Sequence, residues 1–259
     1  MPPEFTDSRD NPIAAIYGLY TSLVQSCALD SRYSLGGKLI FAGGLEGDAK
    51  DLLFAANIAG AASLAAAADP AVQRQAIRDG AVDFLVTSLE EALRILKNEI
   101  RKQQAVSVGV GVDPGQLAEA MLDRGVLPDL LPPLPWSELS EEHRRRFQAD
   151  GSRPLTLLRE SQHRFVRWNV DREFVRWLPR LDACLQAVIP VEDLARRRWL
   201  RLAPKYLGRM AQRVHGIALT DTEISQFREQ AAALLQQHLE DATADNHPIQ
   251  IRIDGMLVG

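Results

Sequence analysis

The first half of the chain alternates between short apolar runs and longer stretches in which apolar residues recur every three or four positions. Short runs predict buried strands, and the three- and four-residue spacing predicts amphipathic helices. Expected strands cover 37–43, 81–87 and 105–112, and expected helices cover 11–30, 49–61, 69–80, 89–103 and 113–125. Residues 62–69 are ambiguous, because alanine favours a helix while their place in the alternation favours a second strand. This alternation predicts βαβ units, and therefore an α/β fold with a Rossmann-like parallel sheet.

Residues at the expected helix ends support these boundaries. Ser88 is followed three residues later by Glu91, which is the pattern of a capping box. Gly80 and Gly125 stand where glycine commonly ends a helix. Asp113 precedes the last of these helices and is expected to cap it.

The second half is dominated by long stretches of helical spacing. Expected helices cover 137–151, 156–169, 172–189, 191–216 and 220–242. Thr220 and Glu223 form a second capping-box pattern, and the alternation around Asp254-Gly255 predicts a small C-terminal hairpin. We therefore expect a Rossmann-like domain with an N-terminal helix over residues 1–135, followed by a mostly helical, arginine-rich region over 136–259.

Charge separates the same two halves. The net charge of the 259 residues is −4, but residues 1–135 carry 11 Lys and Arg against 17 Asp and Glu, whereas residues 136–259 carry 19 against 17. The basic side chains concentrate in 143–213, where 17 of them stand against 7 acidic ones. The proline-rich stretch that ends near residue 135 is the expected boundary between the halves.

Composition disfavours some classes of protein. No apolar run approaches the roughly 18 residues of a membrane helix, and the polar N-terminus lacks a secretion-signal pattern, so a cytoplasmic location is expected. Cys27 and Cys184 are far apart and are expected to be isolated buried thiols, with a disulfide or a nucleophile as the alternative. The five histidines lack metal-ligand spacing, so no metal site is expected, and no Ser-His-Asp arrangement or nucleophile elbow is present.

A glycine-rich turn connects the first expected strand to the following helix. The stretch FAGGLEGDAKD (residues 41–51) has the frame in which N–H groups at a helix start bind a phosphate, but it also carries carboxylates, which repel one. It is either a nucleotide or other anion site or a turn that serves the fold alone. A second pair, Gly109 and Gly111, favours close packing over ligand contact. The candidate ligand-binding residues are Gly43, Gly44, Leu45, Glu46, Gly47 and Asp48 in the turn, and Asp69 after the second strand.

The tetrapeptide Phe-Val-Arg-Trp occurs twice, at 165–168 and 174–177, and RRRWLR follows at 196–201. Arginine and tryptophan together can bind phosphate backbones and stack on bases. The same residues also suit a helix core flanked by solvated arginines, and this intramolecular packing is the favoured interpretation. An anionic ligand or a partner protein is the next alternative, and nucleic acid is the least favoured.

Four motifs, in their order and spacing, resemble the central NAD-binding domain of urocanase (urocanate hydratase). They are the lead-in LGGKLIFAGG, the helix end IAGAASL followed by Asp69, the helix LEEAL after Ser88, and the closing stretch RGVLPDLL. Together they cover about residues 35–131. The resemblance implies a Rossmann-like domain that binds NAD, which in this family is the electrophile that adds to urocanate during its hydration in histidine breakdown.

Departures from the family pattern change this expectation. The family's loop is richer in glycine, whereas Glu46, Asp48 and Lys50 interrupt it here. The acidic residue expected to hold the ribose aligns with Ala67, two positions before Asp69. The polar Gln-Thr-Ser-Ala-His segment expected after the last strand is replaced by LPPLPW, and no catalytic cysteine can be matched.

We therefore expect a diverged relative of urocanate hydratase, a lyase by resemblance, with weakened or altered NAD binding and no complete hydratase site of its own. Its catalytic residues cannot be assigned from the sequence. The alternative is a non-enzymatic module that binds a small ligand or a protein, as a homodimer or with a partner. Binding of an anion or nucleic acid through the basic half is less favoured.

Overall fold

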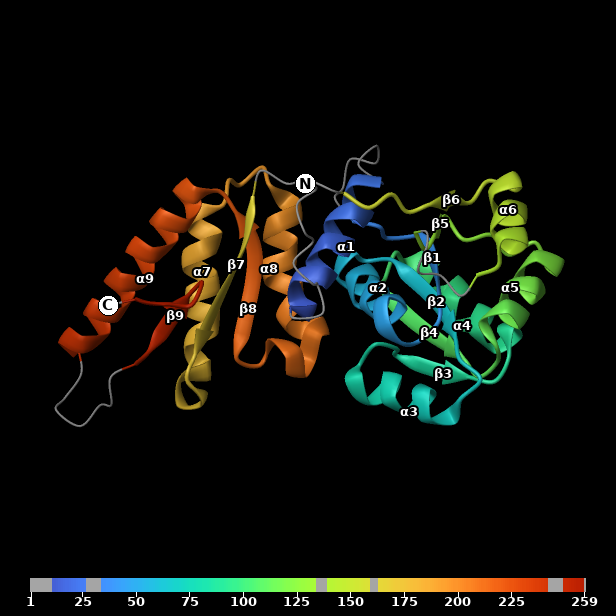
Figure 1. Ribbon diagram of the computed structural model, residues 1–259, viewed down its shortest axis with the longest axis horizontal. Coiled ribbons are helices and arrows are strands. Elements are labelled where there is room, and N and C mark those ends of the chain that lie inside the picture. Colours follow the sequence, from blue (N-terminus) through green and yellow to red (C-terminus); the bar gives the residue numbers. More distant parts are fainter. Residues whose placement is uncertain (1–10, 27–33, 134–138, 159–162, 242–248, 259) are drawn as a thin grey trace, which may run out of the picture. The chain divides into compact units, whose positions relative to one another are not determined.

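The chain forms two compact units, Met1–Leu158 and Arg159–Gly259, which are described separately (Figure 1). The computed structural model describes residues 11–26, 34–133, 139–158, 163–241 and 249–258. Among these residues, no helix combines the length and the apolar character needed to cross a membrane.

The first unit is built around a parallel six-stranded sheet. Its strands are β1 (Leu39–Gly43), β2 (Ala62–Ala66), β3 (Phe84–Val86), β4 (Val106–Val110), β5 (Leu130–Leu131) and β6 (Arg153–Pro154). Their order across the sheet is β3-β4-β2-β1-β5-β6. The chain starts in the middle with β1, continues toward one edge, and then places β5 on the other side of β1. The topological switch point, where open α/β sheets bind ligands, therefore lies between β1 and β5.

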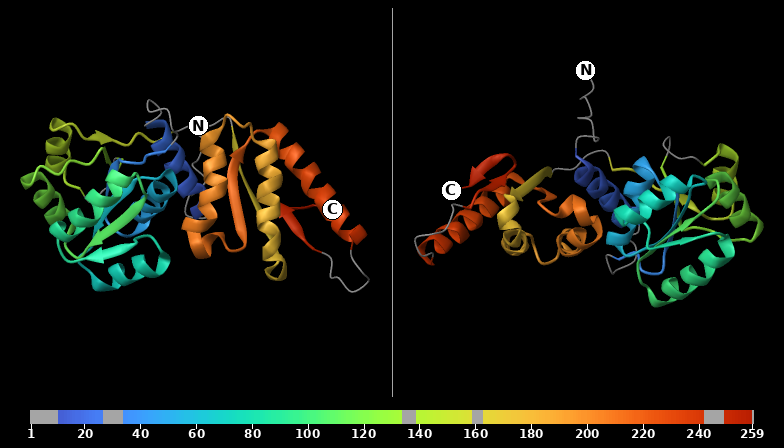
Figure 2. Two further views of the ribbon diagram at one scale, coloured as in Figure 1. Left: turned by 180° about the vertical axis from the view of Figure 1, so that it is seen from behind. Right: turned by 90° about the horizontal axis from the view of Figure 1, so that it is seen from below.

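Helices cover both faces of this sheet. Helices α4 (Leu89–Lys102), α5 (Pro114–Asp123) and α6 (Glu141–Ala149) share one apolar core with Phe41, Leu64 and Val108. Helix α2 (Gly47–Ala59) covers the opposite face, where Asn57 bonds Ser107, and α1 (Pro12–Ser26) packs on α2. Helix α3 (Pro70–Asp79) contacts β3. The right-hand view of Figure 2 shows the sheet between these two sets of helices.

The structure confirms the predicted α/β fold and its alternation of strands and helices. Every residue of β1, β2 and β4 is buried, because a parallel sheet covered on both faces leaves no polar side. The ambiguous residues 62–69 contain β2. The predicted cap at Ser88 is present, since its hydroxyl accepts from the Glu91 amide at 3.3 Å. The Glu91 carboxylate accepts in return from the amide of Thr87, at 2.9 Å.

The first unit extends beyond residue 135, where we expected it to end. The Phe147 ring on α6 lies 6.2 Å from the Phe41 ring on β1, measured between centroids, and β6 pairs with β5. These contacts join residues 139–158 to the parallel sheet. This packing could not be predicted from the sequence, because Phe147 is far from Phe41 along the chain and a proline-rich stretch separates β5 from α6.

The second unit combines helices with an antiparallel sheet. Its strands are β7 (Arg164–Val170), β8 (Val214–Leu219), β9 (Ile251–Ile253) and β10 (Met256–Val258), in the order β10-β9-β7-β8. Its helices are η2 (Arg172–Trp177), α7 (Leu178–Val188), α8 (Leu194–Leu207), η3 (Gly208–Ala211) and α9 (Asp221–Asp241). The predicted hairpin is confirmed, with Asp254-Gly255 as its turn. The predicted Thr220–Glu223 capping box is also confirmed.

The helix predicted over 156–169 is wrong, because Arg164–Val170 forms strand β7. Val166, Trp168 and Val170 are buried while Arg167 is exposed and Asn169 is partly exposed, which is the two-residue period of a half-buried strand. The end of the helix predicted over 191–216 likewise belongs to strand β8. The second Phe-Val-Arg-Trp lies in η2, so the identical tetrapeptide adopts two conformations that its surroundings decide.

Candidate functional site

The turn after β1 leaves backbone facing open space. Gly43 and Gly47 have φ angles of 82° and 51°, in the left-handed region that favours glycine. A Cβ added at either residue would meet no atom of the described chain within 4 Å. Leu45, between them, is only 2% exposed and packs over Gly109 of β4. Of the candidate turn residues, Gly43 and Gly47 therefore have free space beside the backbone, while the Leu45 side chain belongs to the core.

Helix α2 begins in this turn and differs from the other helices that follow strands of the sheet. Its N-cap residue, Glu46, makes no side-chain hydrogen bond to the first turn. By contrast, the side chains of Asp69, Ser88 and Asp113 accept from first-turn amides of α3, α4 and α5. The first turn of α2 therefore presents amides without a side-chain acceptor, together with the positive end of the helix dipole.

Three carboxylates modify this helix start. Glu46 and Asp48 are exposed, and Asp51 is partly buried one turn further along. Burial raises the pKa of Asp51 to about 6, which the neighbouring Lys50 opposes and Asp48 reinforces. The Lys50 ammonium forms an ion pair with Asp79 at the end of α3, 2.9 Å away. Lys50 is therefore paired with Asp79 and not with either of the two exposed carboxylates.

Two polar side chains follow the end of β2: Asp69, which was predicted, and Gln73, which was not. The Asp69 carboxylate accepts from the Ala71 amide at 2.7 Å and so caps α3. Ala67, which aligns with the expected ribose-binding acid, is buried. Its carbonyl accepts from Nε2 of Gln73 at 2.8 Å. Gln73 thus places an amide group at this strand end, one helical turn beyond the residue that sequence reasoning chose.

The glycines after β4 serve packing, as favoured from the sequence. A Cβ on Gly109 would lie 3.2 Å from the Leu85 side chain and 3.4 Å from that of Leu45. Asp113 caps α5, accepting from the amides of Gly115 and Gln116 at 2.8 and 3.3 Å. This strand end closes against the turn after β1 rather than opening a second loop.

The end of β5 carries two polar side chains that sequence reasoning missed, both from α6. Nη1 of Arg144 donates to the carbonyl of Pro132, directly after β5, at 2.7 Å. Nε2 of His143 lies 3.1 Å from the Glu119 carboxylate on α5, which also pairs with Arg146. Arg144 lies three residues before the buried Phe147, on the same helix face, and that spacing is the signal that could have revealed it.

The sequence that forms these strands and their connections matches the model of a known domain family. Residues 14–133 fit the model of the urocanase Rossmann-like domain. This match makes the first unit of the chain similar to the Rossmann-like domain of the urocanase family. It is also similar to S-methyl thiourocanate hydratase of Variovorax sp. (strain JCM 16519 / RA8), with 27% identity over 116 residues. That alignment covers 45% of this chain and 21% of the relative, so the matched part of the chain spans about a fifth of that protein.

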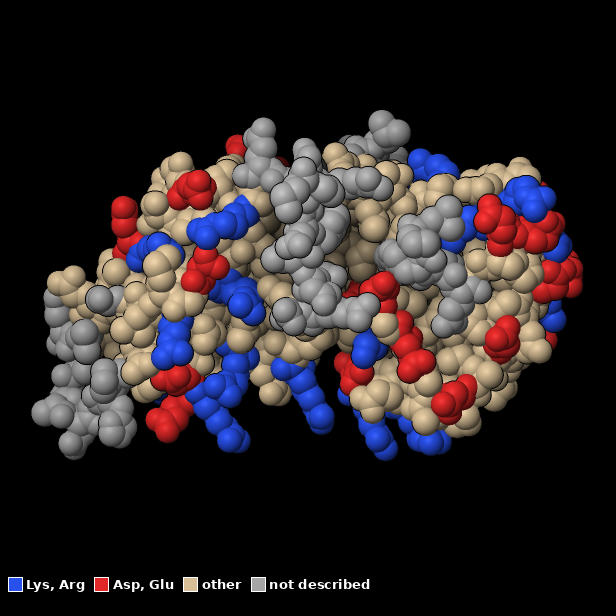
Figure 3. Space-filling model, viewed as in Figure 1, with Lys and Arg blue, Asp and Glu red and all other residues tan. Residues whose placement is uncertain are grey.

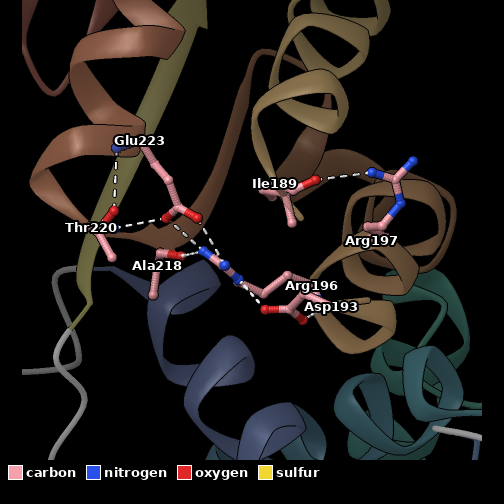
Figure 4. Close-up of polar contacts among 7 residues, drawn as sticks. All are labelled: Ile189, Asp193, Arg196, Arg197, Ala218, Thr220 and Glu223. Atoms are coloured by element: carbon pink, nitrogen blue, oxygen red, sulfur yellow. Dashed lines mark hydrogen bonds and ion pairs between the residues drawn. The ribbon is translucent and has the colours of Figure 1, made fainter. Parts of the chain in front are cut away.

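Outside the matched residues 14–133, two arginines of the RRRWLR stretch have intramolecular partners (Figure 4). Nη1 and Nη2 of Arg196 donate to the two oxygens of Glu223 at 2.7 and 2.9 Å, and Nε donates to Asp193 at 2.6 Å. Arg197 donates to the carbonyls of Gln186 and Ile189 at 2.6 and 3.1 Å, at the end of α7. For these two arginines, the predicted intramolecular packing is confirmed.

Side chains of α8 also donate hydrogen bonds to the carbonyls of the edge strand β8. The carbonyls of Gly216 and Ala218 accept from Nε1 of Trp199 at 2.8 Å and from Nη1 of Arg196 at 3.4 Å. These contacts protect the sheet edge from further strand pairing. On the face in Figure 3, acidic and basic side chains are interspersed over the second unit. That view shows no continuous basic surface of the kind that tracks a nucleic-acid backbone.

Other chemistry expected from the sequence receives little support. Cys184 is a free, partly buried thiol, and burial raises its pKa, which disfavours the reactive thiolate. Cys27 lies outside the described residues. Within the part of the chain that the structure describes, no group of three or more His, Cys, Asp or Glu side chains could hold a metal ion.

Proposed function

We propose that the urocanase Rossmann-like domain of this chain binds a dinucleotide of the NAD type at the carboxyl ends of β1 and its neighbours. The main support for this proposal is the first turn of α2, which has no side-chain cap and can offer its amides to a phosphate. In the helices after β2, β3 and β4, first-turn amides are bonded to the side chain of the N-cap residue. Open space above Gly43 and Gly47 leaves room for close approach of the backbone to a pyrophosphate.

The residues that would hold the ligand follow from the geometry. Backbone amides of the turn 43–48 would bind the pyrophosphate, and we propose that the ribose would lie near the Gln73 amide and the second oxygen of Asp69, both of which follow β2. When bound, NAD would supply the electrophilic nicotinamide ring that the family resemblance implies. Exposed Glu46 and Asp48 oppose the same phosphate charge, so we propose that binding is weakened relative to a glycine-only loop.

We further propose that the chain has no complete hydratase site of its own. The relative is a thiourocanate hydratase, and the aligned segment accounts for 21% of its length. A lyase reaction in histidine breakdown would then require a catalytic part in addition to the matched domain. No cysteine of the described residues lies in the first unit to serve as its catalytic group.

Calorimetric titration with NAD tests this proposal. We expect weak binding by the wild type, loss of binding in Gly44→Asp, and roughly tenfold tighter binding when Glu46→Gln and Asp48→Asn are combined. The matched control is Glu192→Gln combined with Glu229→Gln, which removes the same charge from exposed positions of the second unit. No heat at millimolar NAD for either the wild type or the Glu46/Asp48 variant would overturn the proposal.

A second candidate function is self-association, favoured by an apolar edge. Phe84 and Leu85 of the edge strand β3 are 48% and 37% exposed, and Ile77 on the adjacent α3 is 42% exposed. Unpaired edge strands with apolar side chains pair readily with other strands. We propose a homodimer through this edge. Sedimentation of the wild type and of Phe84→Lys tests it, because a monomer at all concentrations in the wild type would exclude it.

A further inference from the structure

Arg144 is a buried cation whose hydrogen bonds are incomplete. The residue is 3% exposed, and its Nη1 donates to the Pro132 carbonyl at 2.7 Å. Its Nε and Nη2 are buried and have no hydrogen-bond partner among the described residues. Burial lowers the pKa of Arg144 and Glu141 opposes that change, but arginine remains charged in proteins. Neither the described chain nor bulk water satisfies these two donor nitrogens.

The two unsatisfied nitrogens form one edge of the guanidinium plane. Nε–H and one N–H of Nη2 point in parallel, which is the arrangement that binds both oxygens of a carboxylate or phosphate group. A single carbonyl or hydroxyl oxygen would have to be shared between them and would not neutralise the charge. The free edge of Arg144 therefore matches a single oxyanion in a bidentate pair.

The position of Arg144 links this edge to the candidate site. Pro132 directly follows β5, and the pairing of Leu130 with Ile40 sets the end of β5 beside the end of β1. Phe147, on the same helix face, packs on Phe41 of β1. Arg144 therefore stands at the β5 side of the switch point, whereas the uncapped start of α2 stands at its β1 side.

We propose that Arg144 binds an oxyanion of the ligand held at the switch point, through Nε and Nη2, as a binding residue of this site. The assignment of that ligand as a dinucleotide rests on the proposed function, but the requirement for an oxyanion does not. The chemical class is a phosphate or a carboxylate group, since both present two oxygens to one guanidinium edge.

Binding assays on three variants test this inference. Arg144→Met removes the charge, Arg144→Lys keeps the charge without the two-donor edge, and Arg145→Met is the matched control. Arg145 is on the same helix, is 71% exposed and pairs with Glu142. The probes are NAD, inorganic phosphate and acetate, each titrated calorimetrically at fixed ionic strength.

We expect the dissociation constant of the bound probe to rise at least tenfold in Arg144→Met and nearly as much in Arg144→Lys, and to stay within twofold in Arg145→Met. An effect on NAD and phosphate identifies the oxyanion as a phosphate, whereas an effect on acetate alone identifies a carboxylate. Wild-type binding of NAD with unchanged affinity in Arg144→Met would overturn this inference and leave the proposed function standing. Arg144-dependent binding of phosphate or acetate without any binding of NAD would support this inference and overturn the proposed function.

A spectroscopic measurement follows Arg144 directly in the wild type. The ¹⁵Nε–¹Hε signal of Arg144 should move during titration with the bound probe, because the oxyanion accepts from that N–H. Assignment comes from the loss of one signal in Arg144→Lys. A signal that stays fixed at saturation would overturn the inference, as would the absence of binding of all three probes.

Discussion

Two buried arginines, one in each unit, have opposite surroundings. Arg196 in the second unit is bonded through Nε, Nη1 and Nη2 to Asp193 and Glu223, and its positive charge faces two carboxylates. Arg144 in the first unit has one carbonyl as its described partner. The first arrangement is what a structural arginine requires, because burying a charge is favourable only with good partners. The second leaves donors without partners in the described chain.

The same contrast holds for other polar groups of the two units. Buried side-chain nitrogen and oxygen atoms without a partner belong to Asn57, Ser63, His143, Arg144 and Ser152, so all that the described residues contain lie in the first unit. In the second unit, buried Asp182 accepts from Nε1 of Trp168 at 3.1 Å and lies 2.9 Å from Nδ1 of His215. Most buried polar atoms in folded proteins are hydrogen-bonded, so each exception in the first unit requires an explanation of its own.

The largest expected effect comes from breaking the Arg196–Glu223 pair. Burial raises the pKa of Glu223, but the hydrogen bonds from Arg196 and Thr220 outweigh it, and the pKa lies below its ordinary value of 4.5. Glu223→Gln should lower the free energy of unfolding at pH 7 by about 3 kcal/mol, because it leaves a buried cation short of a partner. Urea unfolding followed by tryptophan fluorescence measures it, since Trp168, Trp177 and Trp199 lie in the second unit.

Two comparisons qualify this result. Glu229→Gln, exposed on the same helix, should stay within about 0.5 kcal/mol of the wild type. The depressed pKa means that the Glu223 contribution is present above pH 4.5 and is lost as the pH falls through the lower folded-state value. An equal loss in both variants, or a loss that persists at low pH, would show that the ion pair is not the cause.

The fold of the first unit could be predicted because one physical rule governs it. A parallel sheet covered on both faces needs strands such as 39–43 and 106–110 to be almost entirely apolar, and Asp69, Ser88 and Asp113 mark the helix starts. Strand β7 could not be predicted in this way, because Phe165 and Trp168 are three residues apart, a spacing that also fits one face of a helix. Its pairing with β8, which lies far away in the sequence, decides the conformation.

The candidate site was predictable in part for a similar reason. The turn of residues 43–48 has a local signature, since glycine at positive φ and a helix start are both encoded within a few residues. Gln73 has no such signature, and the spacing of Arg144 and Phe147 marks only a shared helix face. The roles of Arg144 and Gln73 depend on the carbonyls of Pro132 and Ala67, which the fold brings to them. The number of hydrogen bonds that a buried arginine lacks can be known only from the structure.

A smaller effect is expected at Asp51, where the first unit also holds a partly buried charge. Because its folded-state pKa is raised, Asp51 contributes stability below its ordinary pKa of 3.8 and loses it as the pH rises through about 6. The free energy of unfolding of Asp51→Asn should therefore exceed that of the wild type by about 1 kcal/mol at pH 8, allowing for solvent screening of a partly exposed group. Urea unfolding followed by circular dichroism at several pH values measures this difference.

The pH dependence is the decisive part of the Asp51 measurement. The gain should vanish below about pH 4, where both side chains are neutral. Asp123→Asn, an exposed carboxylate at the end of α5, is the control and should show no such trend. A constant gain at every pH would assign the effect to helix propensity instead of to the buried charge.

The smallest effect is expected from Arg144→Met, and this sharpens the comparison of the two arginines. The variant loses one hydrogen bond to Pro132, but it also removes a buried charge with two unmade hydrogen bonds. These contributions oppose each other, so without ligand the free energy of unfolding should stay within about 1 kcal/mol of the wild type. Arg196→Met should cost about 3 kcal/mol, because Glu223 is then left buried without its partner.

Added oxyanion should separate Arg144 from a structural residue. A ligand that binds the folded state raises the free energy of unfolding by RT ln(1 + [L]/Kd), about 2.7 kcal/mol when its concentration is a hundred times Kd. The wild type should gain this stability and Arg144→Met should not, so the difference between them opens only when ligand is present. A loss in ligand-free Arg144→Met as large as that in Arg196→Met would instead place Arg144 with the structural arginines, since its own chain would then be supplying the stabilisation that we assign to the ligand.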